Sequence, residues 1–259
     1  MLSSFSWAIV YRLPEYRYKC GGFVIFAYPG VVIIVQTEHS KKALDARLDC
    51  LFSMLSRDCP ESSPEIFSHM LQLLECIVFW ESTHNIVSKK MSQDLIVDSI
   101  IDSVEGGFLL NDFVFKSSDF DGQIIDAGSG GGFPGVPLAL IYKNIKFILV
   151  DSDRKKCSFL RYVKSKLNIK NIEVLNKKLE NLSPAMVVVT RAAFPPERSN
   201  ILAKAVKQGG ILAIWSTPEA CEVFKQDLIR EGVKMCRKRD YELGQDLKKR
   251  SVLLFKKAR

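Results

Sequence analysis

The sequence predicts a doubly wound α/β fold, in which a mostly parallel β-sheet carries helices on both faces and follows a helical cap. After Gly122, short apolar segments alternate with longer segments of helical periodicity, the order typical of strands joined by crossover helices. Before Gly107, apolar residues recur at helical spacing with few β-branched runs. The 259 residues, of which 47% are hydrophobic, are enough to bury such a core.

The first 40 residues are predicted to be an extension of unknown role. Their longest apolar stretch, Gly21 to Val35, contains a Pro-Gly pair and is shorter than the roughly 20 residues that a spanning helix needs. The stretch is better explained as a β-hairpin of Gly22–Ala27 and Val31–Gln36. We therefore expect no attachment to a membrane.

Residues 41–110 are predicted to form the helical cap from three helices. Leucines recur with helical spacing in the first of them, at Leu44, Leu48, Leu51 and Leu55. Ser63 and Pro64 supply a cap residue and a first-turn proline, so the middle helix is predicted from Pro64 to about Glu81.

Residues 111–259 are predicted to form the sheet domain. Its buried strands are expected at Gln123–Ala127, Lys146–Asp151, Ile172–Asn176, Ala185–Thr190 and Ile211–Ser216. Its crossover helices are expected at Val136–Tyr142, Arg154–Lys166 and Glu197–Val206. The tail adds a helix and two strands, at Pro218–Arg230, Val233–Leu243 and Ser251–Lys257.

A glycine-rich turn follows the first strand of this domain, where an open parallel sheet binds its ligand. Gly128, Gly130 and Gly132 occupy the turn, while Phe133 takes the position at which a dinucleotide fingerprint has a small residue. Asp126 stands directly before the turn, and a carboxylate there attracts a cationic sulfonium but repels a diphosphate. The turn therefore favours S-adenosylmethionine as cofactor.

Three further strand ends are candidates for contact with this cofactor. Asp151, 25 positions after Asp126, is expected to accept hydrogen bonds from the ribose hydroxyls; the alternative is that both aspartates only cap the following helices. Leu179 and Glu180 follow the third strand and are expected near the adenine, unless they form a solvated turn. Arg191 ends the fourth strand, and a functional role and a purely structural ion pair both remain open.

The motifs that the sequence lacks argue against some classes of methyl acceptor. The segment Phe194 to Glu197 lacks the polar and aromatic partners typical of enzymes that methylate exocyclic amines, and the chain has no Pro-Cys pair for attack on a cytosine carbon. Ring nitrogen seven of guanine is unprotonated and exposed, so transfer to it requires chiefly alignment. No catalytic residue is identified by this reasoning.

Charge and cysteine content point to the compartment and the partner. A formal net charge of +8 favours an anionic partner, nucleic acid first. Seven scattered cysteines without a C-x-x-C pair, with only three histidines, argue against a zinc or other metal site and against a disulfide framework. We therefore expect a cytoplasmic protein.

From about Pro64 to its end, the chain resembles the bacterial small-subunit (16S) ribosomal RNA guanine-7 methyltransferases, called RsmG or GidB. The most specific match is the segment Ile125 to Ala139, which reads IDAGSGGGFPGVPLA. Leu149-Val150-Asp151-Ser152 and Thr190-Arg191-Ala192 match later elements. Upstream, the matching residues are Trp80, Asn85 and Asp102-Ser103.

The resemblance implies a Rossmann-like class I methyltransferase fold, with small-subunit ribosomal RNA or the small ribosomal subunit as partner. The cofactor contacts that it implies are Gly128, Phe133, Leu179, Glu180 and Arg191. It also implies that Asn85 faces the substrate. The chain departs from the family pattern at Ser99, where a histidine is usual, at Glu81 and at Trp215, where a lysine is usual. Two alternatives remain: a methyltransferase for a protein or small molecule, and a noncatalytic module that binds S-adenosylmethionine.

Overall fold

The computed structural model describes residues 16–20, 23–28, 31–35, 38–84, 93–116, 118–244 and 247–259. The N-terminal half comprises β1 (Tyr16–Cys20), β2 (Phe23–Tyr28), β3 (Val31–Val35), α1 (Glu38–Asp58), α2 (Ser63–His84), α3 (Gln93–Gly107), the 3₁₀ turn η1 (Phe108–Leu110) and α4 (Asn111–Lys116). The remainder comprises β4 (Gln123–Ala127), α5 (Gly135–Ile141), β5 (Lys146–Asp151), α6 (Arg154–Lys166), β6 (Ile172–Asn176), η2 (Leu179–Asn181), β7 (Ala185–Arg191), η3 (Pro196–Arg198), α7 (Ser199–Ala205), β8 (Val206–Ser216), α8 (Pro218–Arg230), β9 (Val233–Leu243) and β10 (Lys248–Lys257).

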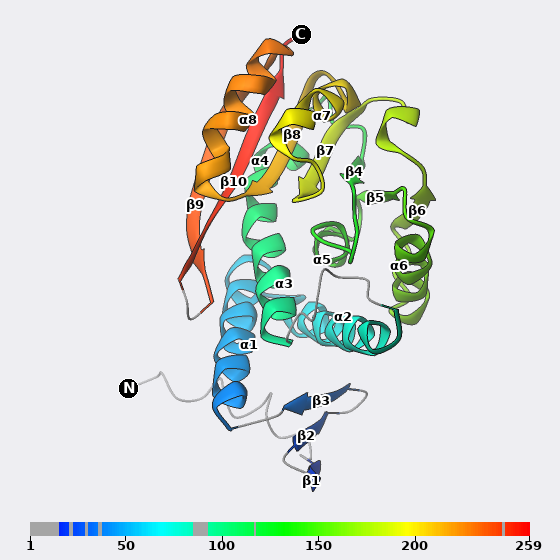
Figure 1. Ribbon diagram of the computed structural model, residues 1–259, viewed down its shortest axis with the longest axis vertical. Coiled ribbons are helices and arrows are strands. Elements are labelled where there is room, and N and C mark those ends of the chain that lie inside the picture. The colour runs from blue at the N-terminus through cyan, green and yellow to red at the C-terminus, as the bar shows by residue number, and fades with distance from the viewer. Residues whose placement is uncertain are drawn as a thin grey trace.

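The predicted doubly wound sheet is confirmed. Seven strands form one sheet in the order β6-β5-β4-β7-β8-β10-β9. The first five are parallel, and β10 enters antiparallel between β8 and the edge strand β9. The chain leaves β4 toward β5 on one side and later returns to β7 on the other, so the order reverses between β4 and β7 (Figure 1). Such a reversal opens a crevice at the carboxyl ends of the two strands.

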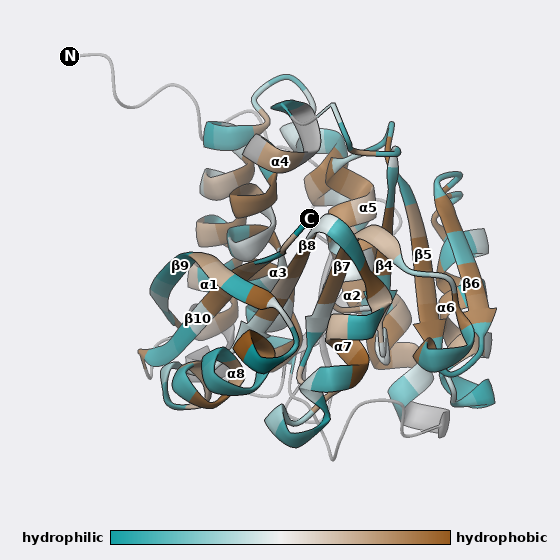
Figure 2. Ribbon diagram, turned by 90° about the horizontal axis from the view of Figure 1, so that it is seen from above, coloured by the Kyte–Doolittle hydropathy of each residue, from teal (hydrophilic) through white to brown (hydrophobic). Residues whose placement is uncertain are grey.

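Helices cover both faces of the sheet (Figure 2). One face packs on α3, α5 and α6, with buried side chains such as Val104, Leu138 and Phe159. The other face packs on α7 and α8 through Leu202 and Phe224. The buried strands are rich in valine, isoleucine and leucine because neither of their faces meets water.

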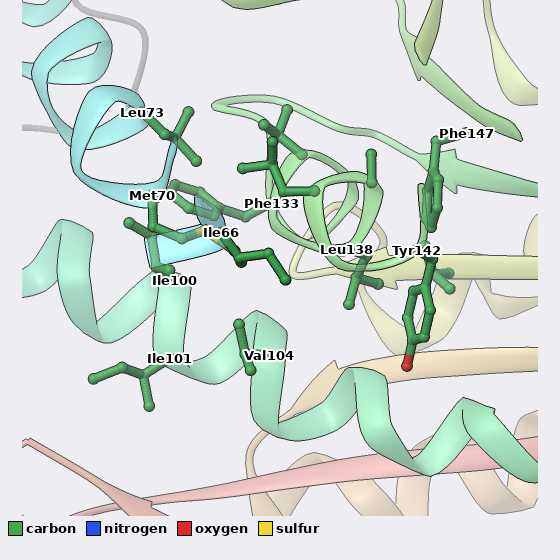
Figure 3. Packing of buried hydrophobic residues seen from close by; sticks show 14 of the residues in the cluster. Ile66, Met70, Leu73, Ile100, Ile101, Val104, Phe133, Leu138, Tyr142 and Phe147 are labelled. Atoms are coloured by element: carbon green, nitrogen blue, oxygen red, sulfur yellow. The ribbon is translucent and has the colours of Figure 1, made fainter. Parts of the chain in front are cut away.

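The three predicted cap helices are α1, α2 and α3, and they share a core with the sheet (Figure 3). Met70 of α2 and Ile100 of α3 lie in the same buried cluster as Leu138 of α5 and Phe147 of β5. Apolar contact therefore fixes the cap against the face of the sheet that carries α5 and α6. The division into a cap at 41–110 and a sheet domain at 111–259 stays a prediction.

The N-terminal segment contains the predicted hairpin, in which β2 pairs antiparallel with β3. A third strand, β1, pairs with β2 and was not predicted from the sequence. The Pro-Gly turn of the hairpin lies outside the described residues. No helix in the described ranges is both long and apolar enough to cross a membrane.

The predicted bounds of three elements in the sheet domain were wrong, those of α7, of β8, which was expected to begin at Ile211, and of β10. The helix expected to run from Glu197 to Val206 is a 3₁₀ turn followed by the shorter α7, and Val206 already begins β8. Val206 pairs with Ala185, so the polar segment after it stays in the sheet although its hydrophobic pattern does not predict a strand. Strand β10 begins at Lys248, three residues before the predicted Ser251.

Candidate active site

A cavity of about 610 Å³ opens at the carboxyl ends of β4, β5 and β7, where the strand order reverses. Its volume is within the range of small-molecule and cofactor pockets. Seven of the eight cofactor contacts expected from the sequence line it: Gly128, Gly130, Phe133, Asp151, Leu179, Glu180 and Arg191. The fold therefore brings together residues from four separate segments of the chain.

The glycine-rich turn is held against the next strand by its backbone. The N–H groups of Gly128 and Ser129 both donate to the carbonyl oxygen of Val150, at 2.8 and 3.0 Å. Gly128 has a φ of +73°, and a Cβ atom there would lie 2.3 Å from the Cβ of Ala193. Only glycine meets both conditions, so the turn and the loop after β7 meet at this residue.

Asp151, at the end of β5, stabilises the same turn by accepting backbone hydrogen bonds. Its Oδ2 accepts the N–H of Gly130 at 2.9 Å, and its Oδ1 accepts the N–H of Asp153 at 2.8 Å. Each carboxylate oxygen has a further acceptor site, and the side chain lines the cavity. The residue that caps α6 is Asp153, whose side chain accepts from Lys155 and Lys156.

Asp126 is the one predicted site residue that does not line the cavity. Its side chain is fully buried, and Oδ2 accepts the N–H of Gly135 at the start of α5, at 3.1 Å. The other carboxylate oxygen, Oδ1, has no hydrogen-bond partner. Burial raises the pKa of this carboxyl to about 7. The helix-capping alternative therefore describes the contacts of Asp126 better than direct contact with a ligand.

Phe133 joins the cavity to the core of the cap. It lines the cavity and is nonetheless almost completely buried. Its side chain lies near those of Met70 from α2 and Ile100 from α3 (Figure 3). The bulky residue that breaks the dinucleotide pattern thus fills the space between the glycine-rich turn and the cap.

Arg191 lies at the end of β7 and contacts both the cap and the cavity. Its Nε donates to Oδ2 of Asp102 at 2.6 Å, and its Nη2 donates to Oγ of Ser99 at 3.1 Å. Its guanidinium carbon lies 5.6 Å from the centre of the Phe133 ring, within range of a cation–π interaction. The structural ion pair anticipated for this arginine exists, and the side chain also lines the cavity.

The partner of Arg191 is a buried carboxylate that sequence reasoning did not single out for this role. Tyr241 of β9 donates to Oδ1 of Asp102 at 2.5 Å. Trp215 of β8 donates from Nε1 to the backbone oxygen of Asp102 at 2.8 Å. Asp102, Arg191 and Tyr241 thus form a cluster, and Ser99 and Trp215, two of the positions that depart from the family pattern, both contact it. The three members of the cluster are far apart in the sequence, and no local motif links them.

The outer part of the cavity is mainly basic. Glu180 lies 3.6 Å from Arg198, which comes from the loop after β7. The guanidinium of Arg198 also lies 5.7 Å from the ring centre of Phe194. The remaining charged lining residues outside the predicted set are Lys156, Lys177 and Lys178. These cations face an opening that an anionic partner could approach.

Trp80 and Asn85 are two of the upstream residues on which the resemblance rests, and the structure describes only Trp80. Trp80 packs its ring against Phe159 and Tyr162 of α6, with centroids 5.7 and 5.1 Å apart. Asn85 lies outside the described residues. Within the ranges that are described, no three His, Cys, Asp or Glu side chains are grouped to hold a metal ion.

The comparison with known protein families agrees with this geometry. Residues 66–234, which contain every cavity-lining residue named above, match the sequence profile of the family described as rRNA small subunit methyltransferase G. The chain belongs to this family. The match includes α3 with Asp102 and extends to the start of β9.

Relatives in the family are similar over part of their length. The chain is 39% identical over 127 residues to the ribosomal RNA small subunit methyltransferase G of Helicobacter bizzozeronii, covering 48% of this chain and 62% of that protein. It is 35% identical over 128 residues to the protein of the same name from Mycoplasma capricolum, covering 48% and 55%. The alignments thus span less than two thirds of these relatives.

Solved structures confirm the class of fold. The magnesium protoporphyrin IX methyltransferase of Synechocystis, solved with bound S-adenosylmethionine, has a TM-score of 0.54 to this chain at 14% identity. The superposition covers 72% of this chain and 97% of that protein. At this identity the similarity establishes the Rossmann-like class I methyltransferase fold alone.

Proposed function

We propose that this protein transfers a methyl group from S-adenosylmethionine to ring nitrogen seven of a guanine in small-subunit (16S) ribosomal RNA. The observation that carries the proposal is the cavity at the strand reversal, which gathers seven predicted cofactor contacts in a chain of the rRNA small subunit methyltransferase G family. The assembled small ribosomal subunit and the naked RNA are both candidate substrates.

The residues around the cavity fit this cofactor. Asp151 has acceptor sites for ribose hydroxyls, and the backbone of Gly128 and Gly130 allows close approach. Leu179 supplies an apolar surface for an adenine, and Glu180 lies beside it. When bound, S-adenosylmethionine supplies an electrophilic methyl group on a sulfonium. We propose that Asp126 supports the site from beneath, by holding the first N–H of α5.

Among the described residues that line the cavity none is assigned as a general base, which is consistent with a guanine nitrogen as acceptor. Nitrogen seven of guanine carries a lone pair and no proton, so its methylation needs no group to remove one. The chain's contribution is then to bind and align the base. The basic rim formed by Lys156, Lys177, Lys178 and Arg198 favours a polyanionic substrate.

A transfer assay tests the proposal. The protein is incubated with S-adenosylmethionine labelled in its methyl group and, in parallel, with small ribosomal subunits, naked small-subunit RNA, large subunits or cell protein. We expect label only in small-subunit RNA, and nuclease digestion followed by mass spectrometry should recover 7-methylguanine. Label in protein or in small molecules would contradict the proposal.

The noncatalytic alternative gives a different result in the same samples. A module that only binds S-adenosylmethionine would give a calorimetric binding signal and no transfer to any acceptor.

A cytoplasmic location, where the ribosomal substrate resides, is part of the proposal. It is supported by the six cysteines whose side chains the structure describes, all of which are free.

A further inference from the structure

The guanidinium of Arg191 is held on the cap side and open on the cavity side. Of its five N–H donors, the one on Nε is used by Asp102 and one on Nη2 by Ser99. The ring of Phe133 lies beside the group, at 5.6 Å. Three donors remain, and Arg191 lines the cavity. The direction in which these donors point is therefore set by the contacts with Asp102, Ser99 and Phe133, of which the 2.6 Å hydrogen bond to Asp102 is the shortest.

Asp102 is itself fixed by a residue from a distant strand. Its side chain is only 3% exposed, and its Oδ2 is taken by Arg191. The hydroxyl of Tyr241 occupies Oδ1 at 2.5 Å. Burial and the Asp102 carboxylate both raise the pKa of Tyr241, so the hydroxyl keeps its proton and remains a donor. Each oxygen of the carboxylate thus has one defined partner.

We propose that Tyr241 is a positioning residue of the methyl-transfer site, which acts by holding Asp102 so that Arg191 points its free donors into the cavity. The inference rests on the proposed function. It assigns a role to the C-terminal hairpin, because Tyr241 lies on β9 directly opposite Arg250 of β10. The hairpin is therefore part of the site although none of its described residues lines the cavity.

Loss of the tyrosine hydroxyl should release this arrangement. Without it, Oδ1 of Asp102 is a buried acceptor with no partner, and the carboxylate rotates away from Nε of Arg191 to reach another donor. Such a rotation loosens the Nε–H hydrogen bond and changes the angle at which Arg191 enters the cavity. A misalignment of this kind lowers the rate of a reaction that depends on orientation while leaving the fold in place.

The first test compares two tyrosine-to-phenylalanine variants of the full chain. Tyr241→Phe removes the hydroxyl and keeps the ring. Tyr142→Phe is the matched control, because its buried hydroxyl also joins the sheet domain to the cap. The hydroxyl oxygen lies 2.9 Å from the carbonyl oxygen of Gly107 and 2.6 Å from Oδ1 of Asn111, and its one proton is donated to either acceptor. With saturating S-adenosylmethionine and small-subunit RNA, we expect the single-turnover rate to fall at least fivefold in Tyr241→Phe and less than twofold in Tyr142→Phe. Rates are counted per molecule that binds cofactor.

A double-variant comparison separates positioning from general stability. If Tyr241 acts through Arg191, Tyr241→Phe has no further effect on the rate in an Arg191→Lys background, because the fork it aligns is gone. A purely structural role predicts the same loss of melting temperature in both backgrounds and no change in rate per folded molecule. Additive effects on the rate would overturn the proposal.

A second measurement does not require turnover. In protein labelled with ¹⁵N-arginine, the Nε–H signal of Arg191 is identified by its disappearance in Arg191→Lys. We expect its exchange with water to rise at least tenfold in Tyr241→Phe and to stay unchanged in Tyr142→Phe. Unchanged exchange in Tyr241→Phe would overturn the positioning role. If the wild-type protein methylates no RNA, the proposed function fails and the exchange rates alone decide the role of Tyr241.

Discussion

Asp126 combines two properties that rarely occur together in a carboxylate near a ligand site. It is fully buried, and only one of its oxygens has a hydrogen-bond donor. Desolvation penalises its charged form, which raises its pKa from 3.8 to about 7. Because the folded protein then binds this proton more tightly than the unfolded chain does, the stability it contributes below about pH 4 is lost as the pH rises toward 7.

The variant Asp126→Asn tests this assignment. The amide stays neutral at every pH and can still accept the N–H of Gly135. The free energy of unfolding of the variant should therefore exceed that of the wild type by an amount that grows between about pH 4 and pH 7, to more than about 1 kcal/mol. Urea unfolding at several pH values measures the difference. A difference that does not change with pH would show that the buried carboxyl does not titrate in this range.

Asp151 has a different expected effect, because its contacts lie at the cavity. Asp151→Ala removes the acceptor for the Gly130 N–H together with the proposed acceptor for the ribose hydroxyls. We expect calorimetry to show affinity for S-adenosylmethionine lowered by about 1.5 to 3 kcal/mol. Asp153→Ala, which removes only the cap of α6, is the control and should lower stability with little change in affinity. Equal loss of affinity in both variants would contradict the ribose assignment.

The glycine-rich turn and the loop after β7 form one element of the site, because Gly128 touches Ala193. A Cβ at Gly122, which does not line the cavity, would have no neighbour within 4 Å, while its φ of +77° is left-handed. Gly122→Ala therefore carries only a local backbone cost of about 1 kcal/mol.

Gly128→Ala carries the same kind of backbone cost and also pushes Ala193 away from the turn. We expect Gly128→Ala to weaken binding of S-adenosylmethionine at least tenfold more than Gly122→Ala does. Calorimetric titration of both proteins, after circular dichroism has verified folding, measures the ratio. Similar affinities would mean that the contact between the turn and the loop does not shape the site.

These elements also explain what the sequence could and could not predict. The turn around Gly128 was predicted because its residues are contiguous and its strand and helix have strong local patterns. Helix α8 and strand β9 were predicted to the residue for the same reason. The partners of Arg191 were not, because Asp102 is 89 positions from it and 139 from Tyr241. Only the folded sheet brings these residues together.

At the scale of the whole molecule, positive charge is concentrated in the last 28 residues. From Gly232 to Arg259 there are ten basic and three acidic residues, which supplies most of the formal net charge of +8. These residues form the β9–β10 hairpin and the chain end. Ser251 pairs with Ser216, the last residue of β8. Lys248 and Lys249, which pair with β9, therefore extend past the carboxyl end of β8, on the side of the sheet where the cavity opens. The alternative is that lysines merely protect the edge strand β9 from pairing with other chains.

Replacing Lys248 and Lys249 with glutamine distinguishes these roles. Both side chains are exposed, whereas Arg250 has a buried Nε and is left unchanged. Each RNA phosphate contact that is lost should reduce the slope of log affinity against log salt by about 0.7 to 0.9, so the double variant should bind small-subunit RNA with a slope lower by about 1.4 to 1.8.

The matched control for this variant is Lys166→Gln with Lys170→Gln. It removes the same charge at the last residue of α6 and in the connection to β6, at the opposite edge of the sheet. Filter-binding titrations over a range of salt concentrations measure both slopes. If the hairpin docks RNA, only the first variant changes its slope, because counterion release depends on contacts and not on net charge alone. Equal slopes in the wild type and both variants, with increased aggregation of the hairpin variant, would favour edge protection instead.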